Sequence, residues 1–310
     1  MNIASIDMGS NTVLLLVCKA DTASGRIWDD KNYYESPRIG KGIKPGARIG
    51  DQKVELLLNI LTDYKKIIDK AQCETVLVNA TNAMRIAANS EEIKKLIENK
   101  FGWRVNIIPG DKEALFSFWG AASTADTAGN KTVIDIGGGS TEVIYGNDKG
   151  VEYKKSFLTG VVSLTEKFAN NNPPGSDEIK DMYDFVNELF SELREFVPAG
   201  VPTIAVAGTP TTLSCIKQGL KTYKEEAVEG SILKNNEIKS LRKTLEQLTH
   251  DKISSSFGDV VKGRVDIILA GTVILDALAD ILAVPEIIVS SKGIRYGAVV
   301  DYIKNNPHQG

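Results

Sequence analysis

Residues 3–17 read IASIDMGSNTVLLLV, and residues 132–146 read TVIDIGGGSTEVIYG. In both stretches an apolar strand ends in aspartate, and one apolar residue, a glycine-containing turn, a threonine and a second apolar strand follow. Two such copies, separated by about the length of a domain, form an internal repeat and predict two domains of like topology. Their two turns would then face each other across a cleft.

The rest of the chain alternates short β-rich runs with longer helical ones, which is typical of the α/β class. The small polar stretch 123–130 is the predicted domain boundary, and the last residues, 306–310, are expected to fray. Further strands are expected near 28–35, 75–80, 104–108, 151–158, 203–207 and 286–290. Helices are expected near 53–70, 91–99, 111–122, 164–168, 177–196, 211–217, 236–248, 264–281 and 293–304.

Composition excludes several classes of protein. With 42% hydrophobic and 25% charged residues the chain is an ordinary globular one, and a net charge of −3 gives no general attraction to nucleic acid. No apolar run is long enough to span a bilayer and no basic leader precedes the first strand, so we expect a cytoplasmic protein without membrane contact. Only two histidines are present, which leaves little room for a Ser-His-Asp triad or a multi-histidine zinc site.

The two glycine turns carry the candidate phosphate and metal ligands. Glycine allows a ligand close to the backbone, and successive N–H groups in such a turn form a nest for phosphate oxygens. Asp7 and Asp135, at strand ends, suit Mg²⁺ or another divalent cation such as Mn²⁺, and Glu142 could share that ion or hold a water. Asp-x-Gly is also a common hairpin turn, but two matched copies favour function. The candidate phosphate-binding residues are Gly9, Ser10, Asn11, Thr12, Gly137, Gly138, Gly139, Ser140 and Thr141.

A third glycine turn, AGTPTTLS at 207–214, follows a strand and opens a helix. Gly208 and Thr209 at this helix N-terminus are a candidate anion site, and the alternative is a simple capped helix start. No GxxxxGK[ST] sequence occurs, so the chain is not a P-loop NTPase.

Glu113 is the candidate general base, because a chain almost without histidine needs a carboxylate for this role. It begins a helix at the junction between the two halves, and its alternative role is to stabilise the helix dipole. Arg38, Arg85 and Lys292 lie in loops near predicted strand ends. They are either solvated surface residues or contacts for a chain of phosphates.

Eight motifs follow one another along the chain: IDMGSNT (6–12), RIGKG (38–42), ATNAMRIAAN (80–89), GDKEA (110–114), DIGGGSTE (135–142), AGTPTTL (207–213), GRVDIILAG (263–271) and VSSKGIRYG (289–297). With these motifs the chain resembles the exopolyphosphatase and guanosine pentaphosphate phosphohydrolase (Ppx/GppA) family, within the actin-like, sugar-kinase and Hsp70 superfamily. The first and fifth motifs recur across that superfamily, whereas all eight in this order are specific to the family.

The resemblance implies two actin-like, ribonuclease H-like domains and hydrolysis of a terminal phosphoanhydride in the cleft between them. It implies that Glu113 is the base, that Asp135 and Glu142 bind metal and position water, and that Arg85 holds polyphosphate. It also implies that the last helix returns to the first domain. The expected domains are therefore 1–123 with 293–310, and 124–292.

Two local sequences depart from the family pattern. Lys112 stands where many members have a second glutamate beside the base, and this change could alter the charge around Glu113. Ser291 and Lys292 replace an acidic position and its neighbour. The chain is also too short to hold the extra domains of longer members, which casts doubt on processive handling of long polyphosphate.

The predicted function is a Mg²⁺-dependent exopolyphosphatase that releases terminal phosphate by in-line attack of water. One alternative is a 5′-phosphohydrolase that converts pppGpp to ppGpp, and another is a non-catalytic sensor of polyphosphate or an alarmone. A sugar-kinase-like phosphotransferase would need paired glycines where this chain has the single Gly208. The related architecture often forms dimers, so the expected partners are polyphosphate or a (p)ppGpp-type molecule and a second copy of the chain.

Overall fold

A computed structural model describes residues 1–122, 129–147 and 149–306 of the chain. Two compact units divide it: unit 1 comprises Met1–Gly120 and the segment from Ile294 onward, and unit 2 comprises Ala121–Gly293. Most of the polar stretch 123–130 and the terminal residues 307–310 lie outside the described residues. No helix in the described ranges is long and apolar enough to cross a membrane.

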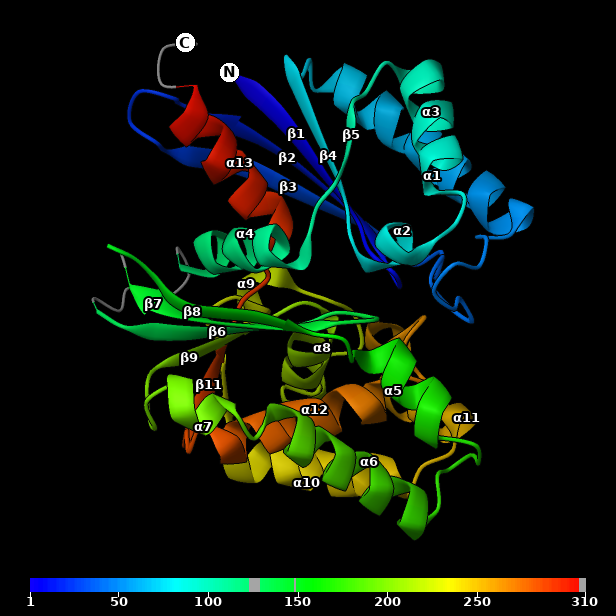
Figure 1. Ribbon diagram of the computed structural model, residues 1–310, viewed down its shortest axis with the longest axis vertical. Helices are drawn as coiled ribbons and strands as arrows, with labels where there is room; N and C mark the ends of the chain where they lie inside the picture. The colour runs from blue at the N-terminus through cyan, green and yellow to red at the C-terminus, as the bar shows by residue number, and fades with distance from the viewer. Residues whose placement is uncertain (123–128, 148, 307–310) are drawn as a thin grey trace. The chain divides into compact units, whose positions relative to one another are not determined.

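Unit 1 is built on a five-stranded mixed sheet in the order β3-β2-β1-β4-β5. β1 pairs antiparallel with β2 and parallel with β4, which in turn pairs parallel with β5. Helices α1 and α3 pack on one face and α13 on the other (Figure 1). The elements are β1 (Asn2–Met8), β2 (Val13–Ala20), β3 (Ile27–Glu35), α1 (Asp51–Lys70), β4 (Thr75–Ala80), α2 (Asn82–Ile86), α3 (Ser90–Phe101), β5 (Val105–Ile107), α4 (Gly110–Ala122) and α13 (Ile294–Asn305).

Unit 2 repeats this plan with a six-stranded sheet in the order β10-β11-β9-β6-β7-β8. Helices α5, α6, α10 and α12 cover one face and enclose the larger apolar core (Figure 1). The elements are β6 (Lys131–Ile136), β7 (Thr141–Asn147), β8 (Gly150–Phe157), α5 (Val161–Phe168), α6 (Ser176–Phe190), α7 (Leu193–Phe196), β9 (Thr203–Val206), α8 (Gly208–Lys217), α9 (Glu225–Val228), β10 (Ile232–Lys234), α10 (Asn235–Glu246), α11 (His250–Phe257), α12 (Ile268–Ile281) and β11 (Glu286–Val289). A short 3₁₀ turn, Gly258–Val261, follows α11.

Parallel pairing brings the candidate residues of each unit to one edge of its sheet. β1, β4 and β5 are parallel, so the first glycine turn, α2 and the start of α4 all follow carboxyl ends. In unit 2 the strands β6, β9 and β11 are parallel, so the second and third glycine turns and residues 290–293 share an edge. Ligands of open α/β sheets bind at such edges.

The α/β class is confirmed, but several predicted boundaries are wrong. The helix expected over 177–196 is interrupted at Ser191–Glu192. The helix expected from 264 begins at Ile268, because the preceding residues form turns. The short elements α2, α9 and β10 were not predicted, since three to five residues show no clear period. The eight-residue α11 was also missed, although the Thr249 hydroxyl caps it.

Candidate functional site

The first glycine turn closes tightly after β1. Gly9 N–H donates to the carbonyl of Thr12 at 2.8 Å, while the N–H groups of Ser10, Asn11 and Thr12 find no acceptor among the described residues. The Ser10 hydroxyl and both polar atoms of the Asn11 amide are buried without a partner in the same residues. Three successive donors backed by unsatisfied side chains are a nest of the kind that binds anions.

Backbone N–H groups of the loop after β3 donate hydrogen bonds to the carbonyl groups of this turn. Arg38 N–H donates to the Asn11 carbonyl at 3.0 Å, and Gly40 N–H donates to the Ser10 carbonyl at 2.8 Å. A Cβ on Gly40 would lie 2.6 Å from the Cβ of Ser10, so only glycine allows this approach. Arg38 itself has φ +54°, a conformation that non-glycine residues rarely adopt. The loop therefore places Arg38 beside the turn at a cost in backbone strain.

Arg85 and Glu113 form an ion pair within unit 1. The Arg85 Nη1 donates to Glu113 Oε2 at 2.5 Å and to the Ile108 carbonyl at 2.9 Å. Glu113 is nearly inaccessible, with 5% of its side chain exposed. The predicted phosphate ligand Arg85 thus binds the predicted base and orients its carboxylate. Both predicted roles stay predictions.

The side chain of Lys112 is directed toward α13. Its ammonium lies 3.5 Å from the Asp301 carboxylate and 5.1 Å from the centre of the Phe116 ring. The positive charge of Lys112 is therefore paired with Asp301.

The second glycine turn has the same frame as the first. Gly137 N–H donates to the Ser140 carbonyl at 2.9 Å, and the N–H groups of Gly138, Gly139 and Ser140 have no acceptor within the described ranges. The Thr141 hydroxyl donates to the Thr159 carbonyl at 2.7 Å, so it anchors the turn. Unit 2 therefore offers a second nest of three donors.

The start of α5 supports this second turn. Val161 N–H donates to the Gly137 carbonyl at 2.9 Å, and Val162 N–H donates to the Gly138 carbonyl at 2.7 Å. A Cβ on Gly160 would lie 2.4 Å from the carbonyl oxygen of Gly137. The first N–H groups of the helix, which have no partner inside it, thus fix the carbonyl side of the turn.

Two carboxylates and a hydroxyl lie at neighbouring positions on the adjacent strands β6, β7 and β8. Asp135 pairs in register with Glu142, and Glu142 pairs with Ser156, so all three side chains share a face. Both carboxylates are buried, and the Ser156 hydroxyl donates to Glu142 Oε1 at 2.5 Å. The sequence reading missed Ser156. Extending the hairpin register from Glu142 to the next strand would have found it.

The Asp135–Glu142 pair fits a magnesium ion by its donor chemistry. Mg²⁺ usually takes one or two carboxylates and keeps several waters, and two buried cross-strand carboxylates supply that set. In the part of the chain that the structure describes, no three or more acidic, histidine or cysteine side chains form a metal cluster. The metal-binding roles of Asp7, Asp135 and Glu142 stay predictions.

Side chains of unit 2 pack directly against the third glycine turn. Ala207 has φ +75°, and a Cβ on Gly208 would lie 1.7 Å from Arg264 Nη1, so the guanidinium rests directly on Gly208. Thr209 is buried against Gly271. Lys292 lies 3.9 Å from Glu229. Gly208, Thr209 and Lys292 all have contacts within the protein, and their phosphate-binding roles stay predictions.

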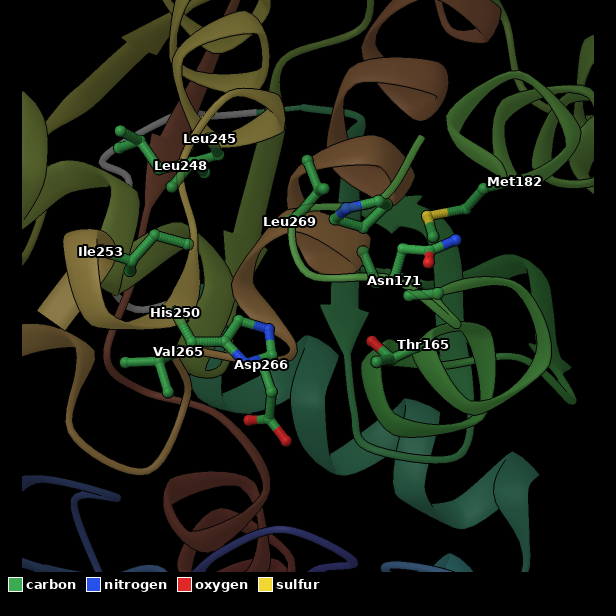
Figure 2. Close-up of a pocket in the computed structure, with 13 residues that line it drawn as sticks. Thr165, Asn171, Met182, Leu245, Leu248, His250, Ile253, Val265, Asp266 and Leu269 are labelled. Atoms are coloured by element: carbon green, nitrogen blue, oxygen red, sulfur yellow. The ribbon is translucent and has the colours of Figure 1, made fainter. Parts of the chain in front are cut away.

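A small cavity lies elsewhere in unit 2, between residues of α5, α6, α10, α11 and α12. Figure 2 shows its largely apolar wall, including Met182, Leu248 and Leu269, together with the polar Asn171 and His250. Its lining contains none of the predicted site residues. The cavity therefore carries no part of the candidate chemistry.

Comparison with protein families gives a match that covers most of the chain. Residues 33–306 match the pattern of the Ppx/GppA phosphatase family. A bifunctional 3-dehydroquinate synthase/phosphatase of Fusobacterium nucleatum is 32% identical over 97% of this chain, which spans only 46% of that relative. Exopolyphosphatase 2 of Mycobacterium tuberculosis is 28% identical over 89% of each chain.

Solved structures resemble the chain over its full length. The Ppx/GppA family member of Aquifex aeolicus has a TM-score of 0.84 and 29% identity, covering 100% of this chain and 99% of that one. An exopolyphosphatase-like protein has a TM-score of 0.90 and 26% identity over 98% of both chains. These matches confirm the predicted α/β fold class, with one mixed sheet in each of two units.

Proposed function

Since the chain belongs to the Ppx/GppA phosphatase family, we propose that it is an exopolyphosphatase that hydrolyses the terminal phosphoanhydride of polyphosphate with a divalent cation, Mg²⁺ or Mn²⁺. Its similarity, over 89% of each chain, to a relative named exopolyphosphatase supports this substrate class. The reaction adds water to the terminal phosphorus and breaks the bond to the bridging oxygen, which releases inorganic phosphate and a chain shorter by one unit.

The observation that carries the proposal is the pair of nests. Each turn offers three consecutive N–H groups without an acceptor among the described residues, at Ser10–Thr12 and at Gly138–Ser140. Phosphoryl transfer spreads negative charge over equatorial oxygens, and prearranged N–H donors stabilise this charge without reorganising. Each nest suits the oxygens of one phosphate group.

Glu113 is the proposed general base. Its buried carboxylate is held by Arg85, so it is oriented to accept a proton from the attacking water. A carboxylate held in one orientation by a guanidinium can both position this water and take its proton. Arg85 then has a positioning role in addition to any contact with phosphate.

Asp135 and Glu142 are the proposed holders of Mg²⁺, with Asp7 as a further candidate. When bound, the ion would neutralise charge on the phosphate oxygens. Glu142 also supplies a carboxylate oxygen fixed by Ser156, which can orient a water molecule. Arg38 and Lys292 remain candidates for contacts farther along the substrate.

The test measures phosphate release with Mg²⁺ from a short polyphosphate, a long polyphosphate and pppGpp side by side. The Glu113→Gln variant serves as the blank, and we expect it to lower turnover on polyphosphate by about 10²–10⁴-fold. Lys112→Gln is the matched control, because it alters the neighbouring residue without touching the base.

Release from polyphosphate that the Glu113→Gln protein loses supports the proposal. Release from pppGpp alone would show a pppGpp phosphohydrolase instead. Tight binding without release from any substrate would show a sensor. Full activity of the Glu113→Gln protein would contradict the assignment of the base.

A further inference from the structure

The hydroxyl of Ser156 binds the carboxylate of Glu142. Ser156 lies directly opposite Glu142 in the β7–β8 register, and its Oγ donates to Oε1 at 2.5 Å. Glu142 in turn lies opposite Asp135, so the hydroxyl and the two carboxylates form a row across three strands. The apolar core of unit 2 packs on the other face, through Ile134, Val143 and Phe157.

We propose that Ser156 is a positioning residue for the phosphatase reaction, which acts by fixing the Glu142 carboxylate relative to Asp135. This inference rests on the proposed function of Glu142. A glutamate has three rotatable side-chain bonds, and the strand fixes only its Cα and Cβ. The Ser156 hydroxyl restricts the carboxylate further by binding Oε1, as outer ligands do in metal and catalytic sites.

The position on β8 suits this role. Ser156 is short, so its hydroxyl reaches only its cross-strand neighbour, and a longer polar side chain could reach past it. The residues on either side are used differently: the Lys155 ammonium pairs with Glu192 at 2.6 Å, and Phe157 packs in the core. The charge of Lys155 is therefore directed away from Glu142.

The experiment compares Ser156→Thr with Ser156→Val, which have the same shape but differ by a hydroxyl in place of a methyl. Both suit a β-strand. We expect Ser156→Thr to keep turnover within about threefold and Ser156→Val to lower kcat by roughly 10–100-fold, the range for outer-shell partners. KM should change by less than about threefold, because the nests are untouched. Ser191→Ala, at the exposed end of α6, is the control and should match the parent protein.

A double-mutant cycle separates positioning from general damage. If Ser156 acts through Glu142, then Ser156→Val added to a Glu142→Leu protein should change kcat by less than about twofold. A loss of the same size in both backgrounds would overturn the inference. Equal activity of the Ser156→Val and Ser156→Thr proteins would also overturn it.

Crystal structures of the parent, Ser156→Thr and Ser156→Val proteins give a readout that needs no turnover. The Glu142 carboxylate should keep its position with threonine and move with valine. An unmoved carboxylate in the Ser156→Val protein would overturn the inference even if the parent proved inactive. An inactive parent with a displaced carboxylate would instead contradict only the proposed function.

Discussion

The turn at Gly9–Thr12 and the turn at Gly137–Ser140 are closed by the same hydrogen bond, from the N–H of the first residue to the carbonyl of the fourth. Their hairpin neighbours differ. Asp7 lies opposite Leu14 on β2, whereas Asp135 lies opposite Glu142 on β7. Only the second turn therefore has a carboxylate pair. The two copies thus share the backbone of the turn, whereas the second copy alone of the two adds a cross-strand pair of carboxylates.

The supports of the two turns differ as well. A loop residue, Gly40, approaches the first turn, while the second turn is held by Gly160 and the N-terminus of α5. Both supports bind carbonyl groups of the turn and leave three of its N–H groups without an acceptor among the described residues. The two turns thus share their N–H donors, whereas different elements support them.

The largest effect is expected from making the second turn like the first. Glu142→Leu places leucine where the first hairpin has Leu14, and should lower polyphosphate turnover about 10²-fold or more, since outer partners alone are worth 10–100-fold. Leucine fills a similar volume, so the melting temperature should stay close to that of the parent. Phosphate release and thermal unfolding check both. A variant that keeps more than a tenth of the parent turnover would contradict the proposed role of the Glu142 carboxylate.

A smaller effect is expected at the supporting glycines. In Gly160→Ala the new Cβ would lie within 2.7 Å of three backbone atoms, so the variant should lose about 1–3 kcal/mol of stability and most of its activity. In Gly40→Ala the Cβ would lie 2.6 Å from the Ser10 Cβ and 3.0 Å from its Cα, so the loss should be less.

Denaturant unfolding of both variants, beside Gly150→Ala and Gly50→Ala, measures these losses. The two control positions have nothing within 4 Å of an added Cβ, so no clash arises there, and at Gly50 only the small cost of alanine at the N-cap of α1 is expected. Equal stability of Gly160→Ala and Gly150→Ala would show that the backbone of the second turn can shift to accept the new Cβ with no loss in the free energy of unfolding.

Much of this fold could be predicted because the repeat around Asp7 and Asp135 fixes strand, turn and strand by local pattern. The β6–β7 hairpin then sets which residues face Asp135 across the strands. Ser156 was not recognised as a neighbour of Glu142 because it belongs to the next hairpin, β7–β8. Gly160 and Gly40 could not be assigned, since their role depends on contacts with a turn distant in sequence. The left-handed conformation of Ala207 likewise has no local signal, because alanine rarely adopts it.

The smallest effect is expected at Lys112. Its ammonium faces Asp301, and this pair is half exposed on the lysine side, so it contributes roughly 0–1 kcal/mol. Lys112→Gln should therefore change turnover by less than about twofold, as measured by phosphate release. A change of tenfold would mean that this charge acts on Glu113 and that unit 1 contributes more to the ionic chemistry than its turn suggests.

The most direct test of unequal turns is the kcat for phosphate release from polyphosphate by Asp7→Asn and Asp135→Asn proteins, measured under the same Mg²⁺ concentration. Both substitutions remove one charge from equivalent strand ends and keep the side-chain shape. We expect Asp135→Asn to lower kcat about 10²-fold and Asp7→Asn to lower it about tenfold or less. Equal losses, or a greater loss at Asp7, would contradict the unequal roles of the two turns.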